Sequence, residues 1–195
     1  MKALIALATK NAGKVREFNH AFEGTGITFV SLLDIPNAPD VEEHGETYEE
    51  NALIKARAIV KATGMPAVAD DSGIEIDVMP GELGVFSARF GGDMPASEVN
   101  EIVLKRLEGV ENRACRYVCA LAYVEPATGR EALVTATCEG IVHDRQEGDK
   151  GFGFDPIFFV PEYGKTMAQL PLEVKNRISH RAKAMAKLKA ELVAK

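Results

Sequence analysis

Residues 3–14 read ALIALATKNAGK, an apolar run followed at once by small, hydroxyl, amide and lysine residues. The run Ala3–Ala8 is typical of a buried strand. A helix is expected directly after the loop, because Val15, Phe18 and Phe22 recur at helical spacing. A strand that leads into a helix in this way favours the α/β fold class.

The rest of the chain continues this alternation. Thr47 and Glu50 form a capping-box pattern at the start of a second helix, which should end near Gly64. Two short strands are predicted on either side of an acidic turn at residues 70–73, and Ser97 is predicted to cap a third helix. Further predicted elements are a hairpin of Cys115–Val124 and Ala132–Val142, a short strand at Ile157–Val160, and one long helix after Pro171.

Composition limits the domain count, the location and the partners. A chain of 195 residues with 46% apolar content can form one sizeable core, so we expect a single, two-lobed domain over residues 1–195 with a central mixed β-sheet flanked by helices. The net charge of −6 argues against binding to a nucleic-acid polymer. No apolar run approaches the roughly 20 residues that span a bilayer, and Met1-Lys2 leads into a strand rather than a signal segment. We therefore expect a cytoplasmic protein without a membrane partner.

The cysteines carry no recognisable chemistry. Cys115, Cys119 and Cys138 lack the CxxC spacing of zinc sites, so we expect them to be buried thiols.

The loop after the first strand has the residue types of an anion site. Thr9, Asn11 and Lys14 alternate with residues small enough to let backbone N–H groups approach an anion. The start of the following helix would add its positive end, and Lys14 would add a point charge. Because the pattern is not a Walker A loop, an ordinary strand-to-helix turn is the alternative.

The acidic pair Asp70-Asp71 indicates a cation site. Adjacent carboxylates after an apolar run are costly to bury without a cation or several donors. Mg²⁺ takes one or two protein carboxylates and completes its shell with phosphate oxygens and water. Five glutamates lie upstream and could supply a further carboxylate, namely Glu42, Glu43, Glu46, Glu49 and Glu50. A solvated acidic turn is the alternative.

A third segment, Gly151–Pro156, combines aromatic rings with a carboxylate. A phenylalanine ring can stack on a base, and Asp155 can accept a hydrogen bond from a protonated ring nitrogen. Lys175, His180 and Arg181 follow as potential donors. A core position is the alternative for Phe154, and a solvated cationic face is the alternative for the lysines of the last helix.

These segments, taken in chain order, resemble the inosine/xanthosine triphosphate pyrophosphatase family. The resemblance implies a two-lobed α/β fold, a homodimer, and magnesium-dependent hydrolysis of ITP, dITP and XTP to the nucleoside monophosphate and pyrophosphate. The segments that carry it are Thr9–Lys14, Glu42 to Gly45, Asn51-Ala52 with Lys55-Ala56-Arg57, Ala69–Gly73, Ser87-Ala88-Arg89, Gly151–Phe159 and Ile178–Arg181.

The resemblance also implies roles for single residues. Asp71 is implied as the proton acceptor, with Asp70 a competing candidate, and Glu42 and Asp71 as the ligands of one or more Mg²⁺ ions. The implied substrate-binding residues are Thr9, Lys10, Asn11, Lys14 and Ser72 for the phosphates and their surroundings, and Phe152, Gly153, Phe154, Asp155, Lys175, His180 and Arg181 for the base.

Two other classes of protein are alternatives. A Ser72–His180–Asp71 hydrolase would need a nucleophile elbow, and the chain contains no G-x-S-x-G. A nucleotide sensor or RNA-binding module would bind without releasing pyrophosphate, and the acidic net charge counts against the RNA-binding version.

Overall fold

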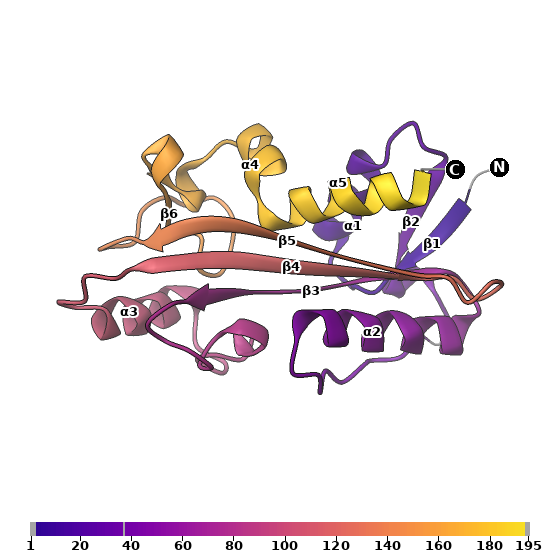
Figure 1. The fold of residues 1–195 in the computed structure, drawn as a ribbon, viewed down its shortest axis with the longest axis horizontal. Helices are drawn as coiled ribbons and strands as arrows, with labels where there is room; N and C mark the ends of the chain where they lie inside the picture. The colour runs from indigo at the N-terminus through magenta and orange to yellow at the C-terminus, as the bar shows by residue number, and fades with distance from the viewer. Residues whose placement is uncertain (1–2, 37, 194–195) are drawn as a thin grey trace. The chain divides into compact units, whose positions relative to one another are not determined.

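The computed structural model describes residues 3–36 and 38–193. Met1-Lys2, on which the expected absence of a signal segment depends, lie outside the described residues. A seven-stranded sheet has the order β2-β1-β3-β4-β5-β6-β7 (Figure 1). β1 pairs in parallel with β2 and β3, whereas β6 is antiparallel to β5 and β7. The predicted α/β fold with a mixed sheet is confirmed. The strands are β1 (Ala3–Leu7), β2 (Ile27–Ser31), β3 (Ala67–Ile76), β4 (Ala114–Val124), β5 (Glu131–Val142), β6 (Phe158–Val160) and β7 (Lys165–Thr166).

Five α-helices and four short 3₁₀ turns connect the described strands. The helices are α1 (Ala12–Ala21), α2 (Tyr48–Thr63), α3 (Ala96–Arg106), α4 (Leu172–Ile178) and α5 (His180–Val193). The 3₁₀ turns are η1 (Leu32–Asp34), η2 (Gly84–Phe86), η3 (Pro161–Tyr163) and η4 (Met167–Gln169). No helix of the described residues is long and apolar enough to cross a membrane.

The chain forms two compact units. Unit 1 comprises the residues up to Asp71, residues 119–136 and the residues from Arg181 onward. Unit 2 comprises Ser72–Val118 and Thr137–His180. The long strands β3, β4 and β5 each continue from one unit into the other.

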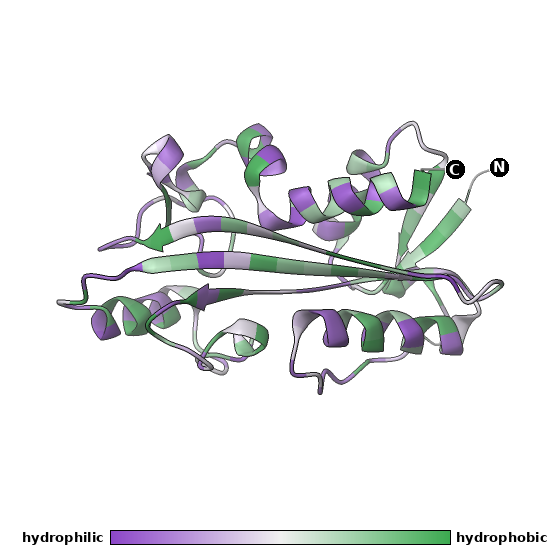
Figure 2. Ribbon diagram, in the orientation of Figure 1, coloured by the Kyte–Doolittle hydropathy of each residue, from purple (hydrophilic) through white to green (hydrophobic). Residues whose placement is uncertain are grey.

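In unit 1, helices cover both faces of the strands. Ile5 and Leu7 of β1 belong to a cluster with Phe18 of α1 and Leu188 of α5, whereas Ala6 packs with Ile59 of α2. Successive strand residues point to opposite faces, so α1 and α5 share one face and α2 covers the other. Figure 2 shows that α2 and α5 each contain both hydrophilic and hydrophobic residues, as helices with one buried side do.

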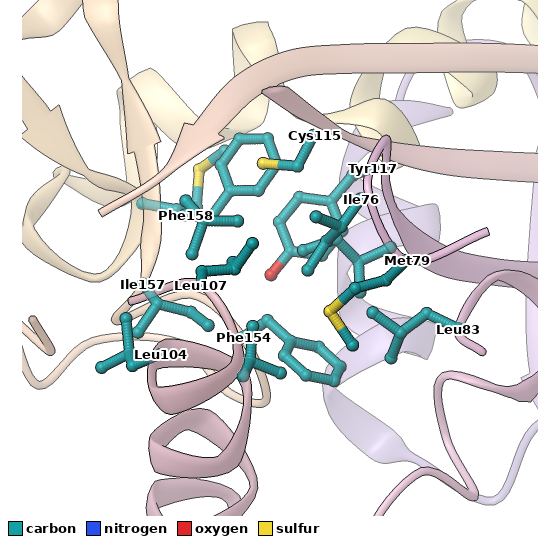
Figure 3. Close-up of a cluster of buried hydrophobic side chains, with 14 of the residues drawn as sticks. Ile76, Met79, Leu83, Leu104, Leu107, Cys115, Tyr117, Phe154, Ile157 and Phe158 are labelled. Carbon is teal, nitrogen blue, oxygen red and sulfur yellow. The ribbon is translucent and has the colours of Figure 1, made fainter. Parts of the chain in front are cut away.

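The core of unit 2 forms around the other halves of the long strands. Ile76 of β3, Leu107 after α3, Tyr117 of β4 and Phe158 of β6 lie in one buried cluster (Figure 3). Cys115 and Cys138 belong to this cluster, and Cys119 lies in the core of unit 1. All three are buried cysteines outside any disulfide, so the prediction of buried thiols is confirmed.

Local signals predicted several elements correctly. The Thr47 hydroxyl accepts a hydrogen bond from Glu50 N–H at 3.1 Å, and α2 ends at Gly64 in the left-handed conformation with φ of 68°. The predicted hairpin is present as β4 and β5. The predicted Ser97 cap is wrong: α3 begins at Ala96 with Pro95 as its N-cap, so Ser97 lies inside the helix.

The predicted acidic turn at residues 70–73 is also wrong. β3 runs without interruption through these residues. Gly73 permits this path, because a Cβ atom there would lie 2.2 Å from the carbonyl oxygen of Gly84. Since neighbouring strand residues alternate in direction, Asp70 and Asp71 face opposite sides of the sheet.

The single long helix predicted after Pro171 is wrong as well. Ser179 is extended, with φ of −64° and ψ of 150°, and it separates α4 from α5. The break lies at the boundary of the units, so that His180 belongs to unit 2 and Arg181 to unit 1.

Candidate active site

The predicted phosphate loop of unit 1 is a strand-to-helix turn that its own side chains stabilise. Asn11 is the N-cap of α1, and its Oδ1 accepts hydrogen bonds from Gly13 N–H at 2.8 Å and Lys14 N–H at 3.3 Å. Thr9 Oγ1 accepts from Asn11 N–H at 3.1 Å. Thr9 and Asn11 therefore build the helix start, which orients Lys14.

Asp70 lies at the centre of a buried ion-pair network. Its Oδ2 is 2.9 Å from Lys14 Nζ and 3.6 Å from Arg181 Nε. The Asp70 and Arg181 side chains are 5% and 9% exposed. Burial opposes ionisation of Asp70, but Lys14, Arg181 and Lys55 outweigh it and hold the pKa of this carboxyl well below its usual range. Asp70 is thus an ionised anchor for two cations.

Asp71 has a different environment on the opposite side of the strand. Its Oδ2 accepts a hydrogen bond from Asn51 Nδ2 at 3.1 Å, and its Oδ1 is 3.7 Å from Lys55 Nζ. Burial raises the pKa of Asp71, with Glu43 and Asp70 adding to the effect, while Lys55 and Asn51 oppose it. The more basic of the two carboxylates is therefore Asp71.

The oxygen donors around Asp71 fit a magnesium ion that substrate helps to bind. Lys55 Nζ lies 2.8 Å from Glu43 Oε1, which brings a second carboxylate to the neighbourhood of Asp71, and Glu42 is exposed beside it. The described residues contain no cluster of three or more acidic, histidine or cysteine side chains that could hold a metal alone. One or two carboxylates suffice for Mg²⁺ when phosphate oxygens and water complete its shell.

The role of Asp70 as a buried ion-pair anchor can be tested by measuring the free energy of unfolding. We expect Asp70→Asn to lower the free energy of unfolding by about 3 kcal/mol, because Arg181 and Lys14 lose their buried counter-charge. The matched control is Asp40→Asn, which removes the exposed partner of Lys10 and should leave stability almost unchanged. Denaturant unfolding measures both.

The free energy of unfolding should depend on pH through Asp70, and the depressed pKa sets the direction of this dependence. Since the folded pKa of Asp70 is depressed, its ion pairs stabilise the protein at neutral pH, and this stabilisation declines as pH falls below about 4 toward the folded pKa. Asp70→Asn should therefore lose less stability than the wild type on acidification. Equal losses in the two proteins would contradict the assignment.

Unit 2 contains a second polar set, centred on Asp155. Asp155 Oδ2 lies 2.7 Å from Lys175 Nζ, and it accepts a longer hydrogen bond, 3.3 Å, from Phe152 N–H. Oδ1 accepts a hydrogen bond from the Tyr117 hydroxyl at 3.0 Å. Asp155 is buried and Lys175 half-buried, so a carboxylate acceptor and an ammonium donor stand side by side.

The loop before Asp155 is shaped by glycine. Gly151 has φ of +91°, and a Cβ atom there would lie 1.9 Å from Asp155 Oδ2. The next residue, Phe152, is 68% exposed, whereas Phe154 lies in the buried cluster of Figure 3. The structure thus leaves Phe152 as the ring that can stack on a ligand. Gly153 is half-buried, and its carbonyl accepts a hydrogen bond from Asn100 Nδ2 at 3.1 Å.

The remaining predicted residues divide between the units. Lys10 is exposed and contacts Asp40, Glu42 is exposed, and Ser72 is half-buried at the start of unit 2. His180 stacks on Tyr117, with ring centroids 4.7 Å apart. Arg181 pairs with Asp70 within unit 1.

The geometry disfavours the alternative serine hydrolase. Asp71 and Ser72 are neighbours within β3, so their side chains leave the strand in opposite directions. In a catalytic triad the aspartate must orient the histidine that activates the serine. Two oppositely directed neighbours do not form such a relay.

Several polar partners in the site have no clear signal in the sequence. Asn51 and Lys55 on α2 belong to the family pattern without an implied role of their own, although they hold Asp71 and Glu43. Tyr117 carried no signal at all, because it lies within the apolar run of β4. Only the i, i+4 spacing of Asn51 and Lys55, which places them on one helix face, was visible in the sequence.

Comparisons with known proteins find similar sequences and similar folds. A sequence model of the Ham1 family matches residues 5–191. A dITP/XTP pyrophosphatase of Geobacillus kaustophilus is 50% identical over 188 residues, which are 94% of this chain and 91% of that protein. The Ham1 protein of Coxiella burnetii has a structure with a TM-score of 0.91 and 36% identity, covering 99% of this chain and 100% of that one. The Staphylococcus aureus Ham1 structure gives 0.89 and 37%, covering 97% of both chains.

Proposed function

The chain belongs to the Ham1 family, and from this membership we propose that it hydrolyses deaminated purine nucleoside triphosphates to the monophosphate and pyrophosphate. ITP, dITP and XTP are the substrates. The family relationship makes the chain a hydrolase of triphosphate anhydrides, and the polar sets of the two units support roles for individual residues.

The paired Asp155 and Lys175 carry the choice of a 6-oxopurine over adenine. Hypoxanthine and xanthine present an N1–H donor beside an O6 acceptor, whereas adenine presents an acceptor and a donor at these positions. Asp155 Oδ1 can accept a hydrogen bond from N1–H. Lys175 Nζ donates one hydrogen to Asp155 and can donate another to O6. Adenine would place acceptor against acceptor and donor against donor, and such mismatches discriminate strongly.

The charged set of unit 1 fits the triphosphate and its hydrolysis. Lys14 is held by Asp70 but stays 26% exposed, so its other protons can reach a phosphate oxygen. Asp71 would accept the proton of the attacking water, because burial raises the pKa of its carboxyl and makes it the more basic of the two aspartates. We assign Mg²⁺ to Asp71 together with Glu42 or Glu43. When bound, this ion would neutralise charge on the departing pyrophosphate.

Three further properties belong to the same proposal. We place residues 1–195 in one catalytic domain, because a single family model matches residues 5–191 and so includes segments of both units. A homodimer in the cytoplasm follows from the family resemblance and the sequence. The acidic net charge supports a small-molecule substrate rather than a nucleic-acid polymer.

A nucleotide panel tests the function directly. With Mg²⁺ present, the purified protein should release pyrophosphate from ITP and XTP much faster than from ATP or GTP. Equal turnover of all four nucleotides would refute the proposed specificity. Binding of ITP without release of pyrophosphate would identify a nucleotide sensor instead.

A further inference from the structure

Tyr117 is a buried tyrosine whose hydroxyl donates a hydrogen bond to a buried carboxylate. The residue is 8% exposed and lies among apolar side chains, with its oxygen visible inside the cluster of Figure 3. Its ring stacks on Phe158 at 4.3 Å and on His180 at 4.7 Å between centroids. A phenylalanine would suit this apolar position, whereas a buried hydroxyl requires a hydrogen-bond partner. That partner is Asp155.

The Tyr117 hydroxyl completes the contacts that hold Asp155 in place. Lys175 Nζ and Phe152 N–H both contact Oδ2, and Tyr117 alone among these three donors contacts Oδ1. A carboxylate held through both oxygens cannot turn about its Cβ–Cγ bond without losing hydrogen bonds. Each carboxylate oxygen accepts about two hydrogen bonds, so Oδ1 retains one acceptor position.

The protonation state of Tyr117 suits this role. Burial raises the pKa of the Tyr117 hydroxyl far above its usual value, and the neighbouring Asp155 carboxylate adds to the shift. Tyr117 is therefore a hydrogen-bond donor throughout the neutral range. Its stacked neighbours Phe158 and His180 fix the direction of that donor.

We propose that Tyr117 is a specificity-determining positioning residue, which orients Asp155 so that the remaining acceptor position of Oδ1 meets the N1–H of a 6-oxopurine. The inference rests on the proposed function and extends it to a residue outside the predicted site. Tyr117 itself does not contact the base. It acts by restricting Asp155 to one acceptor geometry.

The test compares two tyrosine-to-phenylalanine variants on the same strand. Tyr117→Phe removes the hydroxyl and keeps the stacked ring. Tyr123→Phe is the matched control, because Tyr123 is also 8% exposed on β4 but lies in the core of unit 1. For wild type and both variants, kcat and KM are measured with ITP and ATP in the presence of Mg²⁺, and thermal unfolding is followed in parallel.

Loss of one hydrogen bond to a charged group predicts a rise of about tenfold in KM for ITP in Tyr117→Phe. The value of kcat should stay within about twofold, because the groups of unit 1 are unchanged. The ratio of kcat/KM for ITP over ATP should fall by about tenfold, and Tyr123→Phe should retain the wild-type ratio. A merely structural role would instead lower kcat for both nucleotides in parallel and leave the ratio intact, which would overturn the inference.

The wild-type measurement separates this inference from its premise. A wild type that turns over ITP and ATP equally would overturn the proposed function and the role of Tyr117 together. A wild type that prefers ITP, with a preference that survives in Tyr117→Phe, would overturn the role of Tyr117 alone.

Discussion

Asp71→Asn is expected to lower kcat/KM for ITP by at least about 10³-fold while the protein remains folded. The substitution removes the carboxylate that we assign both to the attacking water and to Mg²⁺, and loss of a general base alone costs about 10² to 10⁴ in rate. Pyrophosphate release under Mg²⁺ measures the activity, and thermal unfolding measures the fold.

The fold should survive because the side-chain contacts of Asp71 tolerate an amide. Asn51 Oδ1 accepts a hydrogen bond from Gly45 N–H at 2.7 Å, which directs its Nδ2 toward residue 71. An asparagine oxygen can accept that hydrogen bond as the aspartate does. Lys55 retains Glu43 and the carbonyl oxygen of Asp70 as partners.

Two other aspartates supply the controls for this experiment. Asp77→Asn makes the same chemical change at an exposed partner of Arg116, and we expect it to leave activity nearly unchanged. Asp70→Asn should reduce stability, as argued above, whereas Asp71→Asn should not. An Asp71→Asn enzyme that keeps more than about a tenth of wild-type activity would contradict the assignment.

The elements that the sequence predicted correctly are those with local causes. The cap of α2 lies within residues 47–50, and its end depends on Gly64, so both signals are contiguous in the chain. The β4–β5 hairpin likewise follows from its turn residues. Such features require no knowledge of distant partners.

The acidic segment was mispredicted because its partners are distant in sequence. Two adjacent aspartates followed by Ser-Gly have the composition of a turn. β3 continues through them because Asp70 meets Lys14 and Arg181, and Asp71 meets Asn51. Those partners come from α1, α5 and α2, and composition alone does not place them.

The break at Ser179 had only a weak local signal, the preference of serine for helix N-caps. The sequence there contains neither proline nor glycine, and apolar residues continue at helical spacing on both sides. The break accompanies the stacking of His180 on Tyr117 and the pairing of Arg181 with Asp70. Long-range contacts thus explain why adjacent residues serve different units.

The other large effect is expected for Asp155→Ala, which should lower the ratio of kcat/KM for ITP over ATP by about 10³-fold. A site built to hydrogen-bond one polarity of base rejects the opposite polarity by about 10⁴, and the carboxylate supplies the acceptor. Without it, ITP loses the N1–H contact and ATP loses the repulsion between Asp155 and adenine N1. The same kinetic measurements with ITP and ATP give the ratio.

A second variant makes the prediction depend on polarity rather than on packing. Asp155→Asn keeps the size of the side chain. With the amide oxygen accepting from Lys175 and Nδ2 in the place of the aspartate Oδ1, the amide can donate one hydrogen to adenine N1 and the other to the Tyr117 hydroxyl oxygen. We therefore expect Asp155→Asn to improve ATP turnover relative to ITP more than Asp155→Ala does. Thermal unfolding should show that both variants fold, because Lys175 is half-buried and can reach water once its partner is gone. If the ratio is unchanged in both variants, Asp155 does not contact the base, and the choice of substrate must be made by other residues.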